Sequence, residues 1–412
     1  MSAPRVYFVA AEPSGDLLAR ETAEALKAKD PEVTLFGIGG RELAKIGLES
    51  PIDIAPLSIL GLFEGLKAYG TVVKLADAAA NAIIEAKPDA VVLVDSWGFM
   101  LRVAQRVRAR NPDIKLIKLV GPQVWATRAG RAKTLAATVD HLICIHQMEV
   151  PFYGPYGLPV TVMGNPALSR TEKGDGARAR TSIDAKSSDQ VVLVLPGSRP
   201  SEIKRVAPVL VEAAWLMKSQ NSDLKIVFAP APSVKEQFLE AFPGIQNWAK
   251  IPDEIVSSAD IMAAADFALA CSGTVTSELA VQETPFLVGY KTGWITWALA
   301  RYLLYKPEHI TLLNIAADDT EVAPEYVQTK FKPDDLAEKA LELLADPIML
   351  QAQIDAQNKA LSRMGERDEA ASKIAANTIL NVISERRSAR NRVSQRRYKS
   401  GVGDQCAGSD LR

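Results

Sequence analysis

The feature of this sequence that most limits its fold is a recurring unit: a short apolar run, a turn of small residues and a helix-like segment. The clearest example is VVLVLPGSRPSEIKR, residues 191–205. Its first five residues are apolar and three are β-branched, which is typical of a strand buried on both faces of a parallel sheet. Pro200 stands where proline is tolerated, in the first turn of a helix. The unit therefore predicts a strand, a tight loop and a helix.

The same unit recurs on both sides of one polar stretch. Before it, strands are predicted at 6–10, 33–40, 90–95, 116–120, 141–145 and 159–166. After it, they are predicted at 191–195, 224–230, 267–270 and 286–290, with a weaker candidate at 248–252. Strands that alternate with helices form doubly wound sheets. We therefore expect an α/β protein with two Rossmann-like domains facing each other across a cleft.

The domain boundaries follow from changes in composition. A chain of 412 residues is too long for one ordinary domain and suits two. Residues 169–190 are polar and rich in Gly, Ser and Asp, so we expect a linker there between a first domain (1–168) and a second (191–360). A C-terminal helix is expected at 361–385, followed by a disordered basic tail at 386–412.

Composition narrows the class of protein. The chain is 48% hydrophobic and 24% charged, as soluble globular proteins are. No apolar run reaches about 18 residues, so we expect no membrane-spanning helix, and the first residues lead into a strand-like run, so we also expect no export. Three distant cysteines argue against a disulfide scaffold and fit a reducing cytoplasm. The tail has eight basic residues against two aspartates, so it could contact anionic lipid, contact nucleic acid non-specifically, or be a solvated tail without a role.

Two loops and one carboxylate are candidates for chemistry. The loop ending in Ser198 and Arg199 precedes a helix, whose exposed amides could hold an anion, although an ordinary turn with a surface arginine has the same sequence. Asp95 ends a predicted strand, where parallel sheets place their ligands, but a helix cap is the commoner reason for such an aspartate. Ser14 or Asp16 is expected to cap the helix that follows the first strand.

Two apolar segments have two interpretations each. Residues 57–75 and 294–305 are apolar at helical spacing. Either could be a buried core helix or a face that binds a membrane surface or acyl chains.

Six motifs occur in a fixed order: AAEPSGD (10–16), VDSWGF (94–99), GPQVWA (121–126), LPGSRPSEI (195–203), CSGTVTSE (271–278) and ITLLNIAA (310–317). Together they closely resemble the lipid-A-disaccharide synthases, a family of inverting glycosyltransferases (family 19) with the B-type glycosyltransferase fold, called GT-B. The resemblance covers about residues 5–380 and leaves the basic tail out.

The resemblance implies a reaction that composition could not show. It is the transfer of 2,3-diacylglucosamine from UDP-2,3-diacylglucosamine to 2,3-diacylglucosamine 1-phosphate (lipid X), with inversion. The products are the β-1,6-linked lipid A disaccharide 1-phosphate and UDP. The resemblance implies no metal and no other cofactor. It also implies a cytoplasmic enzyme attached peripherally to the inner membrane, which favours the lipid-facing interpretation of both apolar segments. It allows a homodimer and gives no specific nucleic-acid partner.

The resemblance also implies roles for particular residues. Asp95 is the expected base in the first, acceptor-binding domain, and Glu278 is expected to bind the ribose hydroxyls in the second. The other UDP-binding residues would be Ser198, Arg199, Ser272, Gly273 and Thr274. Further substrate contacts would come from Glu12, Ser14, Gly15 and Asn314.

Two departures from the family pattern bear on chemistry. Ser96-Trp97-Gly98-Phe99 follows Asp95 where the family has Ala-Pro-Asp-Phe, and Asn165 stands where the family has histidine in Gly-His-Pro. Asn165 can hydrogen-bond but cannot act as a base near neutral pH. Two other functions remain open from the sequence: a UDP-N-acetylglucosamine 2-epimerase, and a non-catalytic relative that binds nucleotide or lipid.

Overall fold

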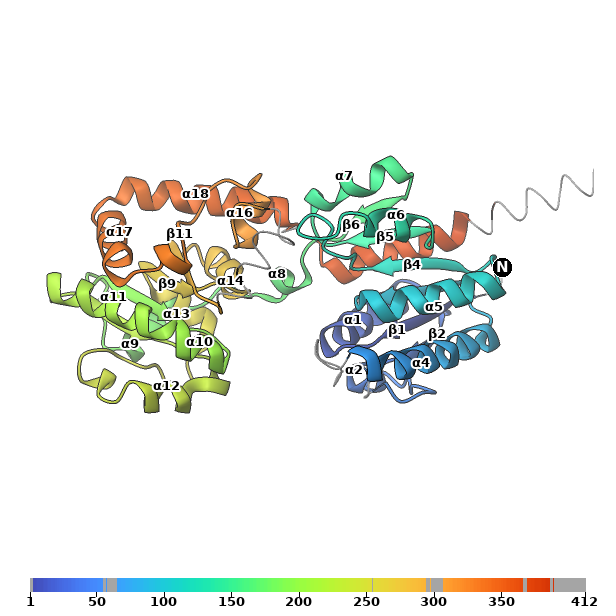
Figure 1. Cartoon of the computed structure of the whole chain (residues 1–412), viewed down its shortest axis with the longest axis horizontal. Helices are drawn as coiled ribbons and strands as arrows, with labels where there is room; N and C mark the ends of the chain where they lie inside the picture. The colour runs from blue at the N-terminus through green and yellow to red at the C-terminus, as the bar shows by residue number, and fades with distance from the viewer. Residues whose placement is uncertain are drawn as a thin grey trace, which may run out of the picture.

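The computed structural model describes residues 3–54, 57, 65–253, 255–293, 297, 307–365, 369–385 and 388. These residues form two units, and each unit is one parallel sheet with helices on both faces (Figure 1). We call them the first unit, around the six-stranded sheet, and the second unit, around the five-stranded sheet. The predicted α/β architecture with two doubly wound sheets is thereby confirmed.

The first sheet has its switch point between β1 and β3. Its strands, in spatial order, are β2 (Thr34–Ile38), β1 (Arg5–Ala10), β3 (Ala90–Val94), β4 (Lys115–Leu119), β5 (His141–Cys144) and β6 (Val160–Val162). The chain leaves β1 towards β2 on one side and builds outward from β3 on the other. At such a reversal the loops after the two strands separate and leave room for a ligand.

Helices cover both faces of the first sheet. One face carries α4 (Gly65–Ala86), α5 (Trp97–Arg110), α6 (Arg131–Ala136) and α7 (Val150–Tyr153), and the other carries α1 (Pro13–Lys29), α2 (Arg41–Ala44) and a C-terminal helix (371–385). The apolar residues of α5 recur every three or four positions, which turns one stripe of the helix to the sheet. That stripe is Phe99, Met100, Val103, Ala104 and Val107.

The second sheet is also parallel and also reverses its strand order at an inner position. Its strands, in spatial order, are β11 (Glu325–Val327), β10 (Phe286–Tyr290), β9 (Phe267–Cys271), β7 (Val191–Leu195) and β8 (Lys225–Phe228). All five residues of β7 are buried, with Val192 and Val194 on one face and Leu193 on the other. The prediction of a strand buried on both faces is confirmed. The switch point lies between β7 and β9.

The helices of the second unit complete two cores. One core contains α10 (Pro200–Arg205), α11 (Ala207–Gln220), α12 (Lys235–Ala241) and α17 (Pro333–Ala345). The other contains α9 (Gly176–Ser182), α13 (Ser258–Ala264), α14 (Val275–Val281), α16 (Leu312–Ala316) and α18 (Pro347–Met364). The polar residues 169–190 include α9, whose Ala179 is fully buried against the second sheet.

Over its described residues, the chain passes between the units twice. It passes from β6 to α8 (Pro166–Arg170) and returns after α18 (Figure 1). The returning segment forms the C-terminal helix, whose Ala375 and Ile379 are fully buried with Phe8 and Leu26 in a core of the first unit. The first unit is therefore built from both ends of the described chain.

The structure adds to or departs from the sequence analysis at three places. Residues 248–252 form no strand, because only Lys250 bridges to Val227. Asn314 lies in α16, and Glu325 in β11 fixes this segment by accepting hydrogen bonds from the amides of Ile310 (2.7 Å) and Thr311 (2.8 Å). β11 itself, a three-residue edge strand, was not predicted.

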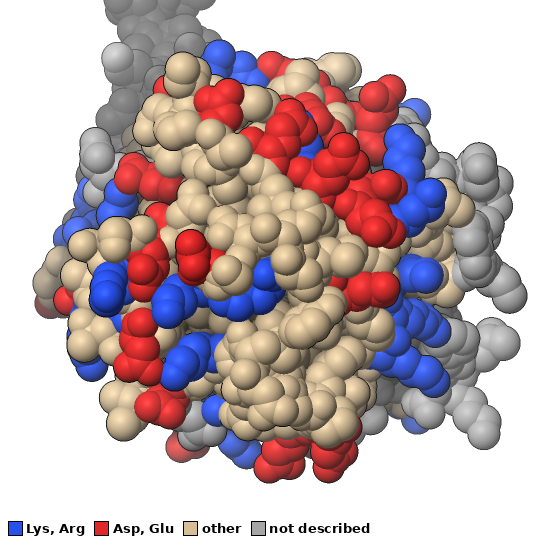
Figure 2. Space-filling view, turned by 90° about the vertical axis from the view of Figure 1, so that its left-hand side faces the viewer, with Lys and Arg blue, Asp and Glu red and all other residues tan. Residues whose placement is uncertain are grey.

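The predicted membrane-facing segments fall largely outside the described residues. Of 57–75, the part from 65 onward belongs to α4, and 294–305 is outside except for position 297. The basic tail at 386–412 is also outside except for position 388. Within the described ranges, no helix combines the length and the apolarity needed to cross a membrane. Over the described part of the face shown in Figure 2, acidic and basic side chains are interspersed around an uncharged area.

Candidate active site

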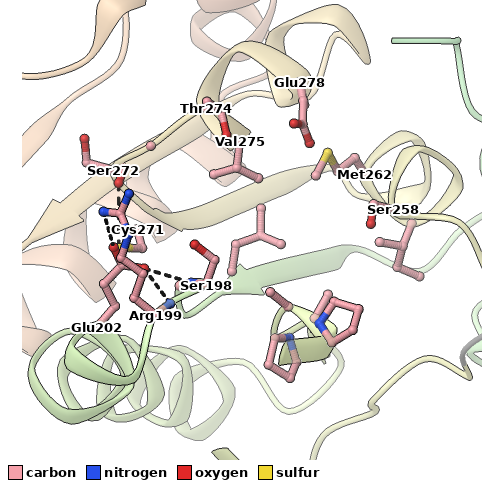
Figure 3. A pocket seen from close by; sticks show the side chains of 18 residues that line it. Ser198, Arg199, Glu202, Ser258, Met262, Cys271, Ser272, Thr274, Val275 and Glu278 are labelled. Carbon is pink, nitrogen blue, oxygen red and sulfur yellow. Dashed lines mark hydrogen bonds and ion pairs between the residues drawn. The ribbon is translucent and has the colours of Figure 1, made fainter. Parts of the chain in front are cut away.

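A cavity of about 370 Å³ opens at the switch point of the second sheet. It lies at the carboxyl ends of β7 and β9, where the loops to α10 and α14 diverge. Figure 3 shows Arg199 and Glu278 on opposite sides of it. Its remaining walls are largely apolar and include Ala229, Pro230, Ala231, Pro232, Ile261 and Met262. Polar and apolar groups line the cavity in similar proportion, and polar groups placed in a concave site are what orient a small-molecule ligand.

The loop after β7 is closed by a carboxylate of its own helix. Glu202, only 6% exposed, accepts hydrogen bonds from the amides of Ser198 (2.8 Å) and Arg199 (3.2 Å). Glu202 thus supplies the carboxylate half of a capping box, which satisfies amides at the helix start. The sequence predicted that these amides would face an anionic ligand, and that part of the prediction is wrong. Gly197 has a φ of +124°, and a Cβ there would lie 2.6 Å from the Glu202 Cβ, so the turn requires glycine.

Arg199 is the cation that this loop offers to a ligand. Its side chain is 73% exposed, and its Nη1 lies 3.4 Å from Oε1 of Glu202. A pairing of this kind at an exposed position is weak. The pairing places the guanidinium near the cavity rim. Because the pairing is weak, the guanidinium can still donate to phosphate oxygens.

The second loop supplies a hydroxyl, backbone amides and a carboxylate. Ser272, Gly273 and Thr274 line the cavity at the start of α14, and no described group accepts a hydrogen bond from the amides of Gly273 and Thr274. Glu278 lies one turn further along α14 and points into the cavity (Figure 3). Partial burial raises the pKa of Glu278, and no described side chain pairs with it. A carboxylate in this position is suited to accept hydrogen bonds from ligand hydroxyls.

Asp95 follows β3 at the switch point of the first sheet, as Ser272 follows β9 at the switch point of the second. Its amide donates to the carbonyl oxygen of Leu119 (2.9 Å), and the backbone then turns through two residues with positive φ, Asp95 (49°) and Ser96 (38°), into α5. Left-handed conformations cost energy for residues with a side chain, and they concentrate at functional sites. The turn ends the strand abruptly and leaves the Asp95 side chain partly exposed.

The loop after β1 lies beside Asp95. A Cβ on Gly15 would be 3.6 Å from the Cβ of Asp95, while Glu12 and Ser14 are exposed at the start of α1. The predicted cap of α1 is wrong, because neither Ser14 nor Asp16 caps it. Asp16 instead accepts hydrogen bonds from backbone amides at the start of α2, including that of Glu42 (2.7 Å).

Lys118, in β4, is not among the residues predicted from sequence. It is 2% exposed, and its ammonium donates to the carbonyl oxygens of Asp95 and of Leu93, the latter at 3.2 Å. Burial lowers the pKa of Lys118 to about 7, an effect that the carboxylates of Asp95 and Glu12 oppose. The signal in the sequence is a lysine inside an otherwise apolar strand, because lysine is almost never fully buried without a partner.

Asn314 is placed differently from the other predicted site residues. It is fully buried, and its Oδ1 accepts from the amides of Val322 (2.8 Å) and Ala323 (2.9 Å). Its Nδ2 donates to the carbonyl of Ala323 and to Glu325. As folded here, the Asn314 amide has no hydrogen-bonding capacity left for a substrate. Any effect on catalysis would be indirect, through the shape of this segment.

The structure thus gathers the predicted residues into two groups. The second-unit group is Ser198, Arg199, Ser272, Gly273, Thr274 and Glu278, and the first-unit group is Glu12, Ser14, Gly15 and Asp95. Within the described residues no hydrogen bond or ion pair joins the groups, and no cluster of three or more His, Cys, Asp or Glu side chains is arranged to hold a metal ion.

Two doubly wound sheets, each with polar residues at its switch point, define a protein of the GT-B class. The model of the lipid-A-disaccharide synthetase family matches residues 6–379, and the chain belongs to this family. A lipid-A-disaccharide synthase of Rhodospirillum centenum is 36% identical over 386 residues, 92% of this chain and 95% of the relative. One from Trichlorobacter lovleyi is 35% identical over 345 residues, 83% of this chain and 88% of the relative.

Solved structures agree on the fold. A putative UDP-N-acetylglucosamine 2-epimerase from Listeria monocytogenes aligns with a TM-score of 0.60 at 14% identity, covering 94% of this chain and 97% of that one. MurG of Acinetobacter baumannii aligns with a TM-score of 0.56 at 15% identity, covering 92% and 99%. Identities this low show the fold alone, so they do not favour the epimerase alternative.

Proposed function

We propose that this protein transfers 2,3-diacylglucosamine from its UDP derivative to the 6-hydroxyl of 2,3-diacylglucosamine 1-phosphate, forming the lipid A disaccharide 1-phosphate and UDP. The observation that carries the proposal is the pairing of two switch points in a chain of this family. One holds a cavity with a cation and a carboxylate, and the other holds Asp95. The cavity with its cation and its carboxylate suits a nucleoside diphosphate, and Asp95 suits an acceptor hydroxyl.

The reaction needs two kinds of assistance. Asp95 would accept the proton of the acceptor hydroxyl as its oxygen attacks the anomeric carbon from the face opposite UDP, which inverts that centre. The bond from the anomeric carbon to the UDP oxygen breaks at the same time, and UDP leaves with the electron pair. Arg199 and the Ser272–Thr274 loop would meet the charge that develops on the leaving diphosphate. Glu278 would accept hydrogen bonds from the ribose hydroxyls.

The acylated substrates support attachment to a membrane surface. The segments 57–75 and 294–305 are the parts of the sequence that could reach a bilayer interface or acyl chains. We propose peripheral attachment on the cytoplasmic side of the inner membrane through these segments. Sedimentation with phospholipid vesicles tests this, and protein that stays in the supernatant in the presence of both substrates would refute it. The family resemblance also allows a homodimer, and light scattering of the purified protein distinguishes it from a monomer.

The transfer reaction is tested directly with UDP-2,3-diacylglucosamine and lipid X. The expected result is a disaccharide 1-phosphate and one UDP for each disaccharide. Tight UDP binding without transfer would instead indicate a non-catalytic relative. Conversion of UDP-N-acetylglucosamine without any acylated donor would indicate the epimerase.

A further inference from the structure

Lys118 is a buried cation directly behind the candidate base. It lies on β4 in register with Leu93 of β3, and its side chain enters the same core as Leu93 and Leu116. At 2% exposure its ammonium has left water, which costs several kcal/mol unless other groups replace the lost hydrogen bonds. Because burial of an ammonium group is costly, a buried lysine in this strand is expected to have a role that an apolar side chain could not fill.

The partners of Lys118 are backbone carbonyls at the end of the strand. Its Nζ donates to the carbonyl oxygens of Leu93 (3.2 Å), Leu119 (3.5 Å) and Asp95. These carbonyls belong to two neighbouring strands, and one belongs to the candidate base itself. The ammonium therefore ties the end of β3 to the end of β4 at the point where the chain turns.

The turn that Lys118 contacts is an unfavourable one. Asp95 and Ser96 both have positive φ, and Ser96, the N-cap of α5, makes no capping hydrogen bond with its side chain. Two successive left-handed residues persist only when the surroundings hold them. The hydrogen bond from Lys118 to the Asp95 carbonyl is such a constraint, because it fixes the peptide that separates these two residues.

We propose that Lys118 is a positioning residue for the candidate base: it holds the turn at Asp95 and Ser96, and thereby the direction of the Asp95 carboxylate. The inference rests on the proposed function for the role of Asp95. The charged groups that act on Lys118 from neighbouring elements are Asp95 after β3 and Glu12 after β1. Both carboxylates favour the ammonium form, so the charge also links the two loops that meet at this switch point.

Three variants separate the contributions. Lys118→Met keeps the length of the side chain but removes its hydrogen bonds and its charge. Lys118→Gln restores a donor without a charge. Lys115→Met is the matched control, since Lys115 lies at the other end of β4 and pairs with Asp140 at 2.9 Å.

Steady-state transfer assays give the first measurement. We expect Lys118→Met to lower kcat by roughly 10²-fold, as a misplaced catalytic group does, with each KM changed by less than about twofold. Lys118→Gln should recover part of the loss, and Lys115→Met should keep kcat. A kcat for Lys118→Met within about twofold of wild type would overturn the inference.

Hydrogen exchange gives a second measurement that does not depend on transfer. Amides in residues 93–100 should exchange faster in Lys118→Met than in wild type and stay unchanged in Lys115→Met. If wild type makes no disaccharide, the proposed function fails, and exchange alone decides whether Lys118 holds the turn. Unchanged exchange in this segment would refute the positioning role even in an active enzyme.

Discussion

Gly164 and Gly365 meet backbone to backbone where the chain passes between its two units. Both have left-handed φ values, 87° and 90°, and a Cβ on Gly164 would lie 2.2 Å from the carbonyl oxygen of Gly365. Beside this contact, Nδ1 of His146 donates to the carbonyl oxygen of Met364 at 3.1 Å. The outgoing and the returning segments are thus joined at one place, and glycine is required on both.

Substitution at this contact should destabilise the protein. Gly365→Ala would bring a Cβ to 2.4 Å from the Cα of Gly164, so we expect the free energy of unfolding to fall by about 1–3 kcal/mol in chemical denaturation. Gly157→Ala is the control, because Gly157 also has a positive φ (67°) but no atom lies within 4 Å of its added Cβ. Equal losses in the two variants would show that the contact contributes nothing beyond backbone conformation.

Loss of the candidate base should separate chemistry from nucleotide binding. Asp95→Asn keeps the shape of the side chain but cannot accept a proton, so we expect kcat to fall by about 10²–10⁴-fold. The Kd for UDP, measured by calorimetry, should not change, because the cavity belongs to the second unit. Transfer at the wild-type rate would remove Asp95 from the mechanism.

Arg199 should contribute to UDP affinity. Arg199→Ala removes the cation at the cavity rim, and we expect UDP to bind at least roughly tenfold more weakly, the usual effect of losing a hydrogen bond to a charged group. Arg205→Ala is the matched control, since Arg205 is an exposed arginine at the far end of the same helix. A similar loss in both variants would point to general electrostatics and not to a specific contact.

The segment before α7 should give stability an unusual pH dependence. Burial raises the pKa of Glu149 to about 7, above its usual 4.5, and lowers the pKa of His146 to about 4, below its usual 6.5. The Glu149 contribution is fully present below pH 4.5 and is lost as the pH rises through 7, because the folded state holds the extra proton in that range. The His146 contribution has the opposite sign and grows from pH 4 to 6.5.

Glu149→Gln should separate the contribution of Glu149 to the pH dependence of stability from that of His146. Glutamine can still accept the amide hydrogen bonds of Ile145 and His146, but it does not titrate. We expect the stability of the variant relative to wild type to increase with pH between 4.5 and 7, by up to a few kcal/mol. Urea unfolding at several pH values measures this difference, and a difference independent of pH would contradict it.

Some of the fold followed from local pattern alone. β7 was predictable because a strand covered on both faces must be apolar at every position, and the residues of β7 are. The closure of its loop by Glu202 also had a local signal, a glutamate at the third position of the helix. The sequence suggested a ligand for the same amides because both occupants are anionic, and only the folded geometry shows which one is present.

Other features depend on residues distant in the sequence. The surroundings of Asn314 are set by Glu325 in a short edge strand, and no periodicity in either segment links the two. Lys118 acquires its role from the end of a neighbouring strand, 23 residues away at Asp95. At Asn165, where the family has histidine, the side chain accepts from the amide of Ala167 (3.0 Å) and caps α8, a role that asparagine fills well.

The packing of the C-terminal helix against the first sheet has a consequence for the order in which the protein matures. A ribosome makes the first sheet early, but the core that contains Phe8 and Leu26 is complete only after residues 371–383 have been added. The second unit, whose residues all lie between the two crossings, has its complete sequence sooner. We therefore expect the part of the protein that is synthesised first to complete its core last, and a nascent chain arrested before residue 371 to leave part of that core exposed to chaperones.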